Sequence, residues 1–277
     1  MKIDRSGFPF YSFLHKIKFL GVACSSRNTK IGVRCDSKNV LFFYLDIFFS
    51  IMSHAEKWIV TTLEWPPFTC EKCPDQGAGV KVLREALKTK GIEIEFVFLP
   101  WSRAIADGKL DQYIGYYPAW MEDIQEGFTA SSPLYSSPLG FIEPKSRPLK
   151  WEKLSDLKGK TIGVVQDYGN TKAFNELVKA KVILTDIATS DEINVKKVAA
   201  GRLDAAIIDI NNAKWFLMND YKAEASKIQI NSKIIEPKDL HIPFNAKNKH
   251  KAILLKEAFQ KISGQKIVDD YIKARIK

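Results

Sequence analysis

From residue 56 onward, apolar positions switch between the two-residue period of a strand and the roughly 3.6-residue period of a helix. A strand ends before Pro66 and Pro67, which cannot donate to a ladder, and Gly91 follows the first helical stripe. The predicted elements are, in order, a strand over 58–62, a helix over 80–90, a strand over 92–99, a helix over 101–107 and a strand over 111–117. This β-α-β-α-β series is typical of a parallel sheet covered by helices.

A second unit with the same alternation follows a strand over 139–143 and a polar, proline-bearing crossing. Its predicted elements are strands over 161–165, 182–184 and 205–209, helices over 169–178, 191–200 and 210–218, and an extended stretch over 228–235. Helices over 252–262 and 267–274 end the chain. We therefore predict an α/β protein of two lobes, with the second lobe inserted into the first and a ligand cleft between them. The predicted limits are 56–143 with 239–277 for lobe 1, 147–232 for lobe 2, and hinge crossings near 142–146 and 233–238.

The first 55 residues have the features of an export signal. An apolar run over 40–52 follows three basic residues and precedes Ser53-His54-Ala55, which places small residues where signal peptidase needs them. We predict cleavage after Ala55 and a periplasmic mature protein, with residues 1–55 as a signal peptide and upstream extension. The alternative is a buried strand or helix, which Asp46 inside the run favours.

Charge and composition argue against several classes of function. The formal net charge is +10, but the first 55 residues hold eight basic and three acidic side chains, so residues 56–277 carry a surplus of only five. That surplus, without a Lys/Arg cluster, does not predict a nucleic-acid surface. No P-loop, dinucleotide fingerprint or metal-ligand spacing occurs, so we expect neither a cofactor nor a metal.

Cys70 and Cys73 form a close pair in the exported part of the chain. The simplest prediction is a small-loop disulfide. A redox pair is the alternative, although Pro74 and a glycine-bearing stretch follow where such a motif usually opens a helix.

The order and spacing of several short motifs resemble the family 3 extracellular solute-binding proteins, which serve polar amino acid ABC transporters. The motifs are Trp65-Pro66-Pro67-Phe68, Pro100-Trp101-Ser102-Arg103-Ala104, Gly108-Lys109-Leu110-Asp111, Ser132-Pro133-Leu134-Tyr135, Asp156-Leu157-Lys158-Gly159-Lys160 and Gly201-Arg202-Leu203-Asp204-Ala205. The resemblance covers residues 56–277 and points to a divergent branch. It implies a type II periplasmic-binding-protein-like fold, hinge closure on a small polar ligand, a monomer, and an inner-membrane ABC permease as partner.

The resemblance also implies roles for individual residues. Trp65 matches an aromatic that stacks on the ligand, or it is a core side chain. Asn170 and Thr171 match the helix N-terminus that binds a ligand carboxylate, or they form an ordinary N-cap. Asp209 matches the carboxylate that receives the ligand's ammonium, or it caps the next helix. Independently of the resemblance, Tyr113, Tyr116, Tyr117 and Trp120 crowd the end of one predicted strand, and with Trp65 and Trp101 they are expected to line the cleft, or they fill the core and the surface.

One departure from the family pattern bears on the ligand. The arginine that clamps a ligand carboxylate has no counterpart in the stretch 119–124, which holds Glu122 and Asp123 instead. Arg103 could supply that cation from the neighbouring helix, or it could be a surface residue. The two acids fit an amine-bearing ligand.

Two other functions are compatible with the same fold. A lyase resembling cyclohexadienyl dehydratase would use a cleft acid, for which Glu64, Glu122 and Asp209 are the candidates. A sensory protein would present its ligand to a membrane receptor. We expect a binding protein rather than an enzyme, because no nucleophile elbow and no Ser/His/Asp order is present.

Overall fold

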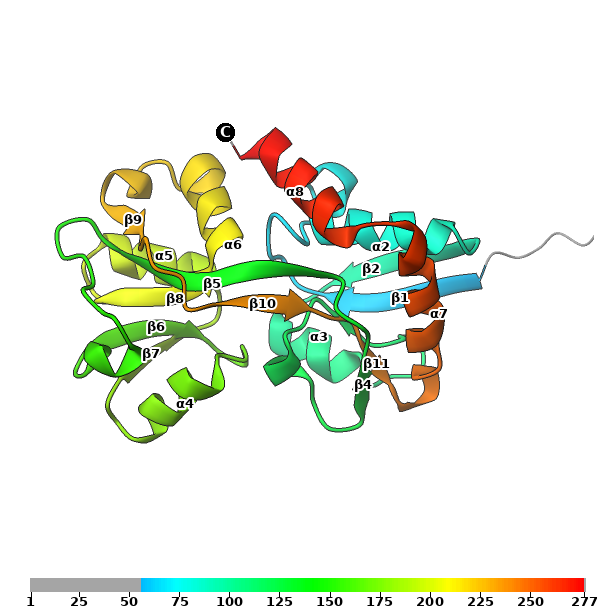
Figure 1. Cartoon of the computed structure of the whole chain (residues 1–277), viewed down its shortest axis with the longest axis horizontal. Helices are drawn as coiled ribbons and strands as arrows, with labels where there is room; N and C mark the ends of the chain where they lie inside the picture. Colours follow the sequence, from blue (N-terminus) through cyan, green and yellow to red (C-terminus); the bar gives the residue numbers. More distant parts are fainter. Residues whose placement is uncertain (1–55, 277) are drawn as a thin grey trace, which may run out of the picture. The chain divides into compact units, whose positions relative to one another are not determined.

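The computed structural model describes residues 56–276 (Figure 1), so the signal-peptide prediction for residues 1–55 lies outside the described part. The first lobe is built on a parallel sheet in the order β2-β1-β3. Its strands are β1 (Glu56–Thr62), β2 (Ile92–Phe98) and β3 (Tyr116–Tyr117), its helices are α2 (Ala78–Lys88), α3 (Trp101–Asp107), α7 (Lys251–Ala258) and α8 (Gly264–Arg275), and a small sheet pairs β4 (Phe128–Ala130) with β11 (Pro243–Asn245).

The second lobe is built on a mixed sheet in the order β10-β5-β8-β6-β7, with β9 also paired to β5. Its strands are β5 (Tyr135–Pro144), β6 (Thr161–Val165), β7 (Leu184–Ala188), β8 (Ala205–Asp209), β9 (Ile228–Ile230) and β10 (Glu236–Leu240), and its helices are α4 (Lys172–Lys179), α5 (Asp191–Ala199) and α6 (Ile210–Trp215). Every residue of β8 is buried, so both faces of the sheet are covered there, and β8 reads as an apolar run that ends at Asp209. Ala205 and Ile207 join the core cluster that includes Phe174 of α4, while Ala206 and Ile208 join the one that includes Val195 of α5.

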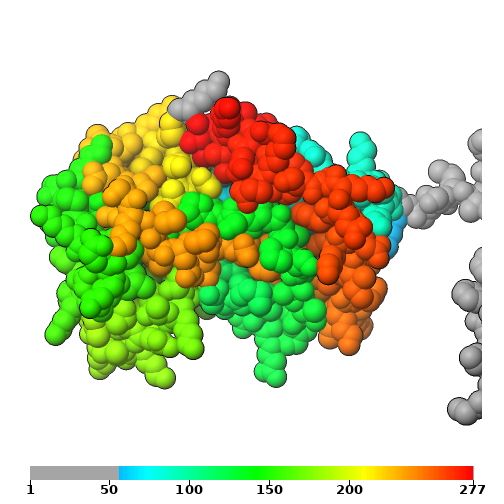
Figure 2. Space-filling view, in the orientation of Figure 1, coloured from blue at the N-terminus to red at the C-terminus, as the bar shows by residue number. Residues whose placement is uncertain are grey.

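Two antiparallel strands connect the lobes. The chain enters the second lobe along β5 and returns along β10, and Figure 1 shows the pair running through the middle of the described part. Leu139 on β5 pairs with Glu236 of β10 on one side and with Asp209 of β8 on the other. In the space-filling view the surface is notched at its lower edge, between the yellow-green segment around α4 and the green segment that precedes β5 (Figure 2). The residue limits predicted for the two lobes stay a prediction.

Most predicted elements are confirmed, and two differ for local reasons. Only Tyr116–Tyr117 of the strand expected over 111–117 pairs with β1. Gly115 has φ of +155°, and a Cβ there would lie 1.8 Å from the Pro243 carbonyl oxygen, so the close approach of β11 bends the chain at this point. The strand expected over 182–184 begins at Leu184, because Val182 and Ile183 still donate to the Leu177 carbonyl at the end of α4.

None of the helices within residues 56–276 combines the length and the apolar character that crossing a membrane requires.

Candidate functional site

A small aromatic cavity lies between the two lobes. Tyr168, just after β6, supplies the second lobe's wall, and the first lobe and β10 supply the rest. The lining residues are Leu63, Trp65, Trp101, Pro118, Trp120, Asp123, Tyr168 and Leu240. The ring of Trp120 packs edge-on against Trp65, with centroids 6.1 Å apart, and against Tyr168 at 6.4 Å. In this closed arrangement the space has room for little more than a water molecule, so a larger ligand requires the lobes to move apart.

Both predicted tryptophans line this cavity and reach across to the second lobe. Trp65 follows β1, where its backbone N–H donates to the Thr69 carbonyl at 2.7 Å and its indole Nε1 donates to Asp191 Oδ2 at 3.2 Å. Trp101 opens α3, and its Nε1 donates to the Asp167 carbonyl at 2.9 Å. Each ring therefore lines the cavity with its apolar part while its indole N–H donates a hydrogen bond, as buried tryptophan usually does.

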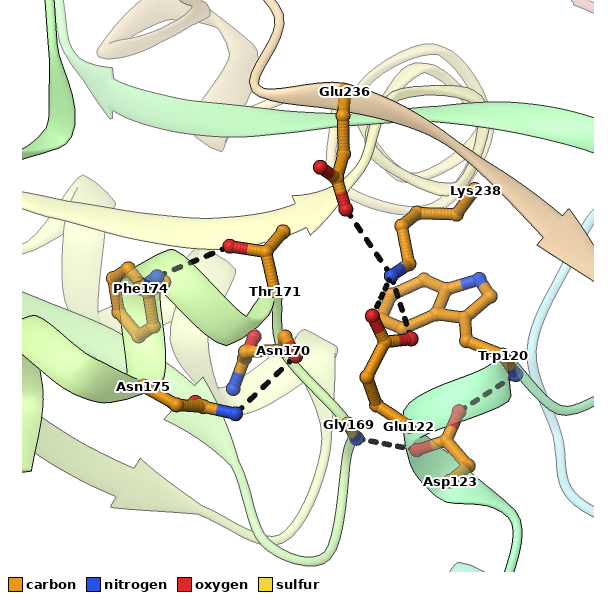
Figure 3. Close-up of polar contacts among 10 residues, drawn as sticks. All are labelled: Trp120, Glu122, Asp123, Gly169, Asn170, Thr171, Phe174, Asn175, Glu236 and Lys238. Atoms are coloured by element: carbon orange, nitrogen blue, oxygen red, sulfur yellow. Dashed lines mark hydrogen bonds and ion pairs between the residues drawn. The ribbon is translucent and has the colours of Figure 1, made fainter.

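Among residues 56–276, Asp123 is the one carboxyl group in the cavity wall, and Figure 3 shows it between Trp120 and Gly169. It ends the short 3-10 helix Met121–Asp123 of the first lobe. Its Oδ2 accepts from the Trp120 backbone N–H at 2.8 Å, and its Oδ1 accepts from the backbone N–H of Gly169 in the second lobe. Burial raises the pKa of Asp123 to about 7, against the opposing effect of these two hydrogen bonds.

The loop at Gly169 packs directly on the helix that carries Asp123. A Cβ at Gly169 would lie 2.7 Å from the Glu122 Cβ and 2.8 Å from the Asp123 backbone nitrogen. Only glycine permits this approach, since real Cβ contacts are essentially never that short. The short separation lets the Gly169 N–H reach the carboxylate across the cleft.

Two more buried carboxyl groups lie at the carboxyl ends of β7 and β8, which flank β6 in the sheet of the second lobe. Asp191 begins α5 after β7, and burial raises its pKa to about 7. Asp209 ends β8, and burial raises its pKa to about 6. Asp209 Oδ1 accepts from the backbone N–H groups of Asn211 at 2.8 Å and Asn212 at 3.0 Å, which caps α6. Its Oδ2 is buried and has no hydrogen-bond partner among residues 56–276.

Tyr116, Tyr117 and Arg103 lie outside the cavity wall. The Tyr116 hydroxyl donates to the Asp123 carbonyl at 2.8 Å, so Tyr116 holds a residue of the cavity wall in place without lining the cavity itself. Tyr117 is fully buried in the core, where its hydroxyl lies 2.6 Å from that of Tyr135. Arg103 points to solvent, with 67% of its side chain exposed, and its Nε donates to both carboxylate oxygens of Asp107 at 2.8 Å.

Asn170 and Thr171 stand at the N-terminus of α4, on the second lobe's side of the cleft (Figure 3). The Thr171 hydroxyl accepts from the Phe174 backbone N–H at 3.1 Å, which is an ordinary N-cap. The Asn170 carbonyl accepts from Asn175 Nδ2 at 3.3 Å. Capping and ligand binding are compatible at such a helix end, and the ligand-binding role stays a prediction.

Lys238 is a buried cation of this region that the sequence analysis did not single out. Its Nζ lies 2.7 Å from both carboxylate oxygens of Glu122 and 3.3 Å from Glu236, and 5.7 Å from the centre of the Trp120 ring (Figure 3). The strand pattern carried a signal for it, because Lys238 and Leu240 share the inward face of β10.

Tyr168 and Asp191 were also missed as site residues. Tyr168 follows β6 and Asp191 follows β7, so both lie beyond the carboxyl ends of strands, where ligands of open α/β sheets bind. The position at the carboxyl end of a strand, which singled out Asp209, also predicts Tyr168 and Asp191 as site residues.

A larger cavity, of about 440 Å³, opens on the other side of Trp65 and Tyr168. Four acidic residues line it, namely Glu64, Asp191, Glu192 and Asp220, whereas Lys72 is the one basic residue among its lining residues. Burial raises the pKa of Glu64 and of Asp220. Cys70 and Cys73 also line it and are joined in a disulfide with Cα atoms 5.3 Å apart.

Within residues 56–276, no three His, Cys, Asp or Glu side chains converge in a way that could hold a metal ion.

No family model matches the chain, and no curated protein is significantly similar to it in sequence. Solved structures do match. An amino acid ABC transporter substrate-binding protein from Streptococcus pneumoniae, bound to L-arginine, matches with a TM-score of 0.64 and 17% identity over 80% of this chain and 96% of its own. The periplasmic VFT2 domain of Bordetella pertussis BvgS matches with a TM-score of 0.65 and 17% identity, over 87% and 98%. The GluR0 ligand-binding core from Nostoc punctiforme, in complex with L-glutamate, matches with a TM-score of 0.56 and 19% identity, over 77% and 98%.

At these identities the likeness establishes the fold. The described chain has the two-lobed periplasmic-binding-protein fold, so the predicted fold class is confirmed. The resemblance to family 3 solute-binding proteins is confirmed at this level, and the low identity fits a divergent branch.

Proposed function

We propose that this chain is a periplasmic solute-binding protein that captures a small amine-bearing solute between its lobes and delivers it to an inner-membrane ABC permease. The observation that carries the proposal is the pair of buried carboxyl groups, Asp123 and Asp191, on either side of the aromatic walls formed by Trp65 and Tyr168.

Charge balance favours a cationic ligand. Neither Asp123, Asp191 nor Asp209 forms an ion pair with a basic side chain within residues 56–276. A buried carboxylate without a counter-charge is unfavourable, and a bound ammonium group would relieve that cost. Aromatic faces add cation–π attraction of about 0.5–2 kcal/mol for a desolvated cation. We place the ammonium group in the aromatic cavity and the remainder of the solute in the acidic cavity beside it.

Hinge closure supplies the mechanism, with no covalent step. The hydrogen bonds that cross the cleft in the closed arrangement include those from Trp65 to Asp191, from Trp101 and Ser102 to Asp167, from Gly169 to Asp123, and from Asn212 Nδ2 to the Pro66 carbonyl. A ligand that contacts both lobes would shift the population toward this closed form by its differential affinity. The β5 and β10 strands would act as the hinge, with crossings near 142–146 and 233–238. The same proposal includes export through residues 1–55. It also includes a monomer that consists of lobe 1 (56–143 with 239–277) and lobe 2 (147–232).

A thermal-shift screen followed by calorimetry tests the proposal. The panel is putrescine, cadaverine, agmatine, phenethylamine, ethanolamine and choline beside the standard α-amino acids. A ligand at about 100 times its Kd should raise the stability by about 2.7 kcal/mol, which a melting curve resolves. We expect Asp191→Asn to weaken a bound amine by about tenfold or more, since it removes a buried charge. Glu93→Gln, on the exposed face of β2, is the matched control. Amine binding that Asp191→Asn leaves unchanged would contradict the proposed site.

A sensory role is the second candidate, and the likeness of fold to a histidine kinase sensor domain favours it. Ligand capture is the same in both cases, so binding data do not separate them. Crosslinking of the ligand-loaded protein to membrane proteins of its own cell would separate the two roles. Mass spectrometry identifies the crosslinked protein as an ABC permease or as a receptor kinase, because the two differ in sequence.

A further inference from the structure

The second lobe offers a backbone N–H to the cleft at Gly169, and the protein's own carboxylate already occupies it. Asp123 Oδ1 accepts from that N–H, while Asp123 Oδ2 accepts from the Trp120 N–H at 2.8 Å. An N–H that faces a closed cleft is a natural partner for an anionic group of a ligand. Here a carboxylate from the first lobe takes that place.

We infer that Asp123 determines ligand specificity, by filling the anion-binding position of the second lobe so that the solute is an amine without a carboxylate group. The inference rests on the proposed function and goes beyond it, because it separates amines from amino acids.

The packing around Gly169 leaves no room for a second carboxylate. The Gly169 Cα lies so close to the first lobe that a single added Cβ would come within 2.7 Å of Glu122. A ligand carboxylate would have to enter between Gly169 and Asp123 and break their hydrogen bond. The lost bond would not be replaced, because the displaced Asp123 carboxylate would then stay buried without a partner for Oδ1.

Lys238 and Arg103, the two cations considered beside the aromatic cavity, are already paired. Lys238 has 6% of its side chain exposed, and its Nζ contacts both oxygens of Glu122 and one of Glu236. Arg103 faces solvent and pairs with Asp107. Within the described part of the chain, the residues that line the aromatic cavity include one carboxyl group and no basic side chain. A ligand carboxylate would therefore meet like charge without a counter-ion, whereas an ammonium group would meet opposite charge.

The fold itself accepts carboxylates, since the Streptococcus and Nostoc structures are bound to arginine and glutamate. The exclusion proposed for this chain is thus a property of its own side chains, with Asp123 at the centre. Removing this side chain should free the Gly169 N–H, lower the negative charge and make room for a carboxylate.

Matched ligand pairs that differ only by the α-carboxylate test the inference. The pairs are arginine and agmatine, lysine and cadaverine, ornithine and putrescine, and phenylalanine and phenethylamine. For wild type we expect the amine of at least one pair to bind about tenfold or more tightly than its amino acid. Asp123→Ala should shrink or reverse that ratio, chiefly by strengthening the amino acid. Asp123→Asn keeps an acceptor for the Gly169 N–H, so it should weaken the amine without strengthening the amino acid.

Glu126→Gln is the control, because it removes an exposed carboxylate three positions away and should leave every ratio unchanged. Melting curves establish that each variant is folded, and Asp123→Asn serves alone if Asp123→Ala does not fold. Equal binding of amine and amino acid by wild type would overturn the inference and leave the proposed function standing. A ratio that Asp123→Ala and Asp123→Asn both leave unchanged would overturn it as well. Failure of every compound in both sets to bind would instead overturn the proposed function, and the inference with it.

Discussion

The indole Nε1 of Trp65 donates a hydrogen bond of 3.2 Å to Asp191 Oδ2, although the two residues are 126 positions apart and belong to different lobes. Trp65 follows the first strand of the first lobe, and Asp191 begins a helix of the second. The bond therefore links the two lobes across the cleft. Trp65 therefore serves both as a wall of the cavity and as a contact that stabilises closure.

Trp65→Phe should weaken amine binding while leaving the lobes folded. The substitution keeps an aromatic face but removes the indole donor, so Asp191 loses this hydrogen bond when the cleft closes. A buried acceptor left without a partner costs about 1–3 kcal/mol, which corresponds to a loss of affinity of about fivefold to a hundredfold. Calorimetry with the tightest amine of the screen measures it.

Trp58→Phe is the matched control for that experiment. Trp58 also loses an indole hydrogen bond, to Glu56 at 2.9 Å, but it lies in the core of the first lobe and does not line the cavity. Its variant should melt at a lower temperature and bind with unchanged affinity. If both variants lost affinity equally, the Trp65 effect would be a general loss of packing.

The stability of the ligand-free protein should contain a component that falls as the pH rises from about 4 to about 7. An unfolded aspartate titrates near its ordinary value, whereas burial raises the pKa of Asp123 and of Asp191 to about 7. Between those values the folded state keeps protons that the unfolded state has released, so the free energy of unfolding decreases with pH. The slope is at most about 1.4 kcal/mol per pH unit for each proton retained. Above about pH 7 the component is constant.

Urea denaturation of wild type and Asp123→Asn at a series of pH values isolates this component, because groups outside the site contribute equally to both. The stability difference between the two proteins should shift in favour of the variant as the pH rises. A difference that moves the other way would mean that Asp123 is ionised when buried, with its charge balanced by the protein.

Cation binding should show the opposite trend with pH. Choline keeps its charge at every pH, so its affinity reports the ionisation of the protein alone. Because the bound cation favours the ionised carboxylates, its affinity should rise between about pH 5 and about pH 7 and then level off. If choline does not bind, cadaverine serves as the probe, since its ammonium groups stay protonated throughout this range. A flat profile would show that neither Asp123 nor Asp191 titrates in the ligand-free protein.

The periodicity of apolar residues was sufficient to predict the two lobes, because helix and strand periods are properties of short segments. The short helix 101–107 was predicted with the bounds that the structure has. The strand at 111–117 was predicted too long, since its interruption depends on Pro243, which is distant in sequence. Contacts between distant segments leave no periodic signal in either of them.

The cavity could be predicted only in part for the same reason. Trp65 and Trp101 were found because they stand at motif positions. Arg103 forms an ion pair with Asp107, one helical turn away, instead of turning toward the ligand. The i, i+4 spacing of these two residues was enough to predict that pair from the sequence. The contact between Asp123 and Gly169 joins two loops of different lobes, and nothing local to either loop indicates it.

Arg103→Ala should leave ligand affinity unchanged, because the side chain faces solvent and its guanidinium already pairs with Asp107. Loss of an exposed i, i+4 pair should lower the stability by no more than about 0.5 kcal/mol. Calorimetry and melting curves of the variant measure both quantities. A large loss of affinity would show instead that Arg103 turns inward when ligand is present, as the alternative from the sequence allows.

Gly169→Ala should hold the cleft open without unfolding either lobe. The new Cβ would lie 2.7 Å from Glu122 and 2.8 Å from the Asp123 nitrogen, so the loop before α4 has to withdraw and its N–H leaves the Asp123 carboxylate. Closure would then be unfavourable, and we expect amine affinity to fall by about tenfold or more. Small-angle scattering with and without the amine measures closure directly, since wild type should become more compact on binding and the variant should not. Lys172→Ala, at an exposed position of α4 three residues further on, is the control and should behave as wild type. A Gly169→Ala protein that binds and compacts normally would show that the ligand-bound cleft closes without the contact between Gly169 and Asp123.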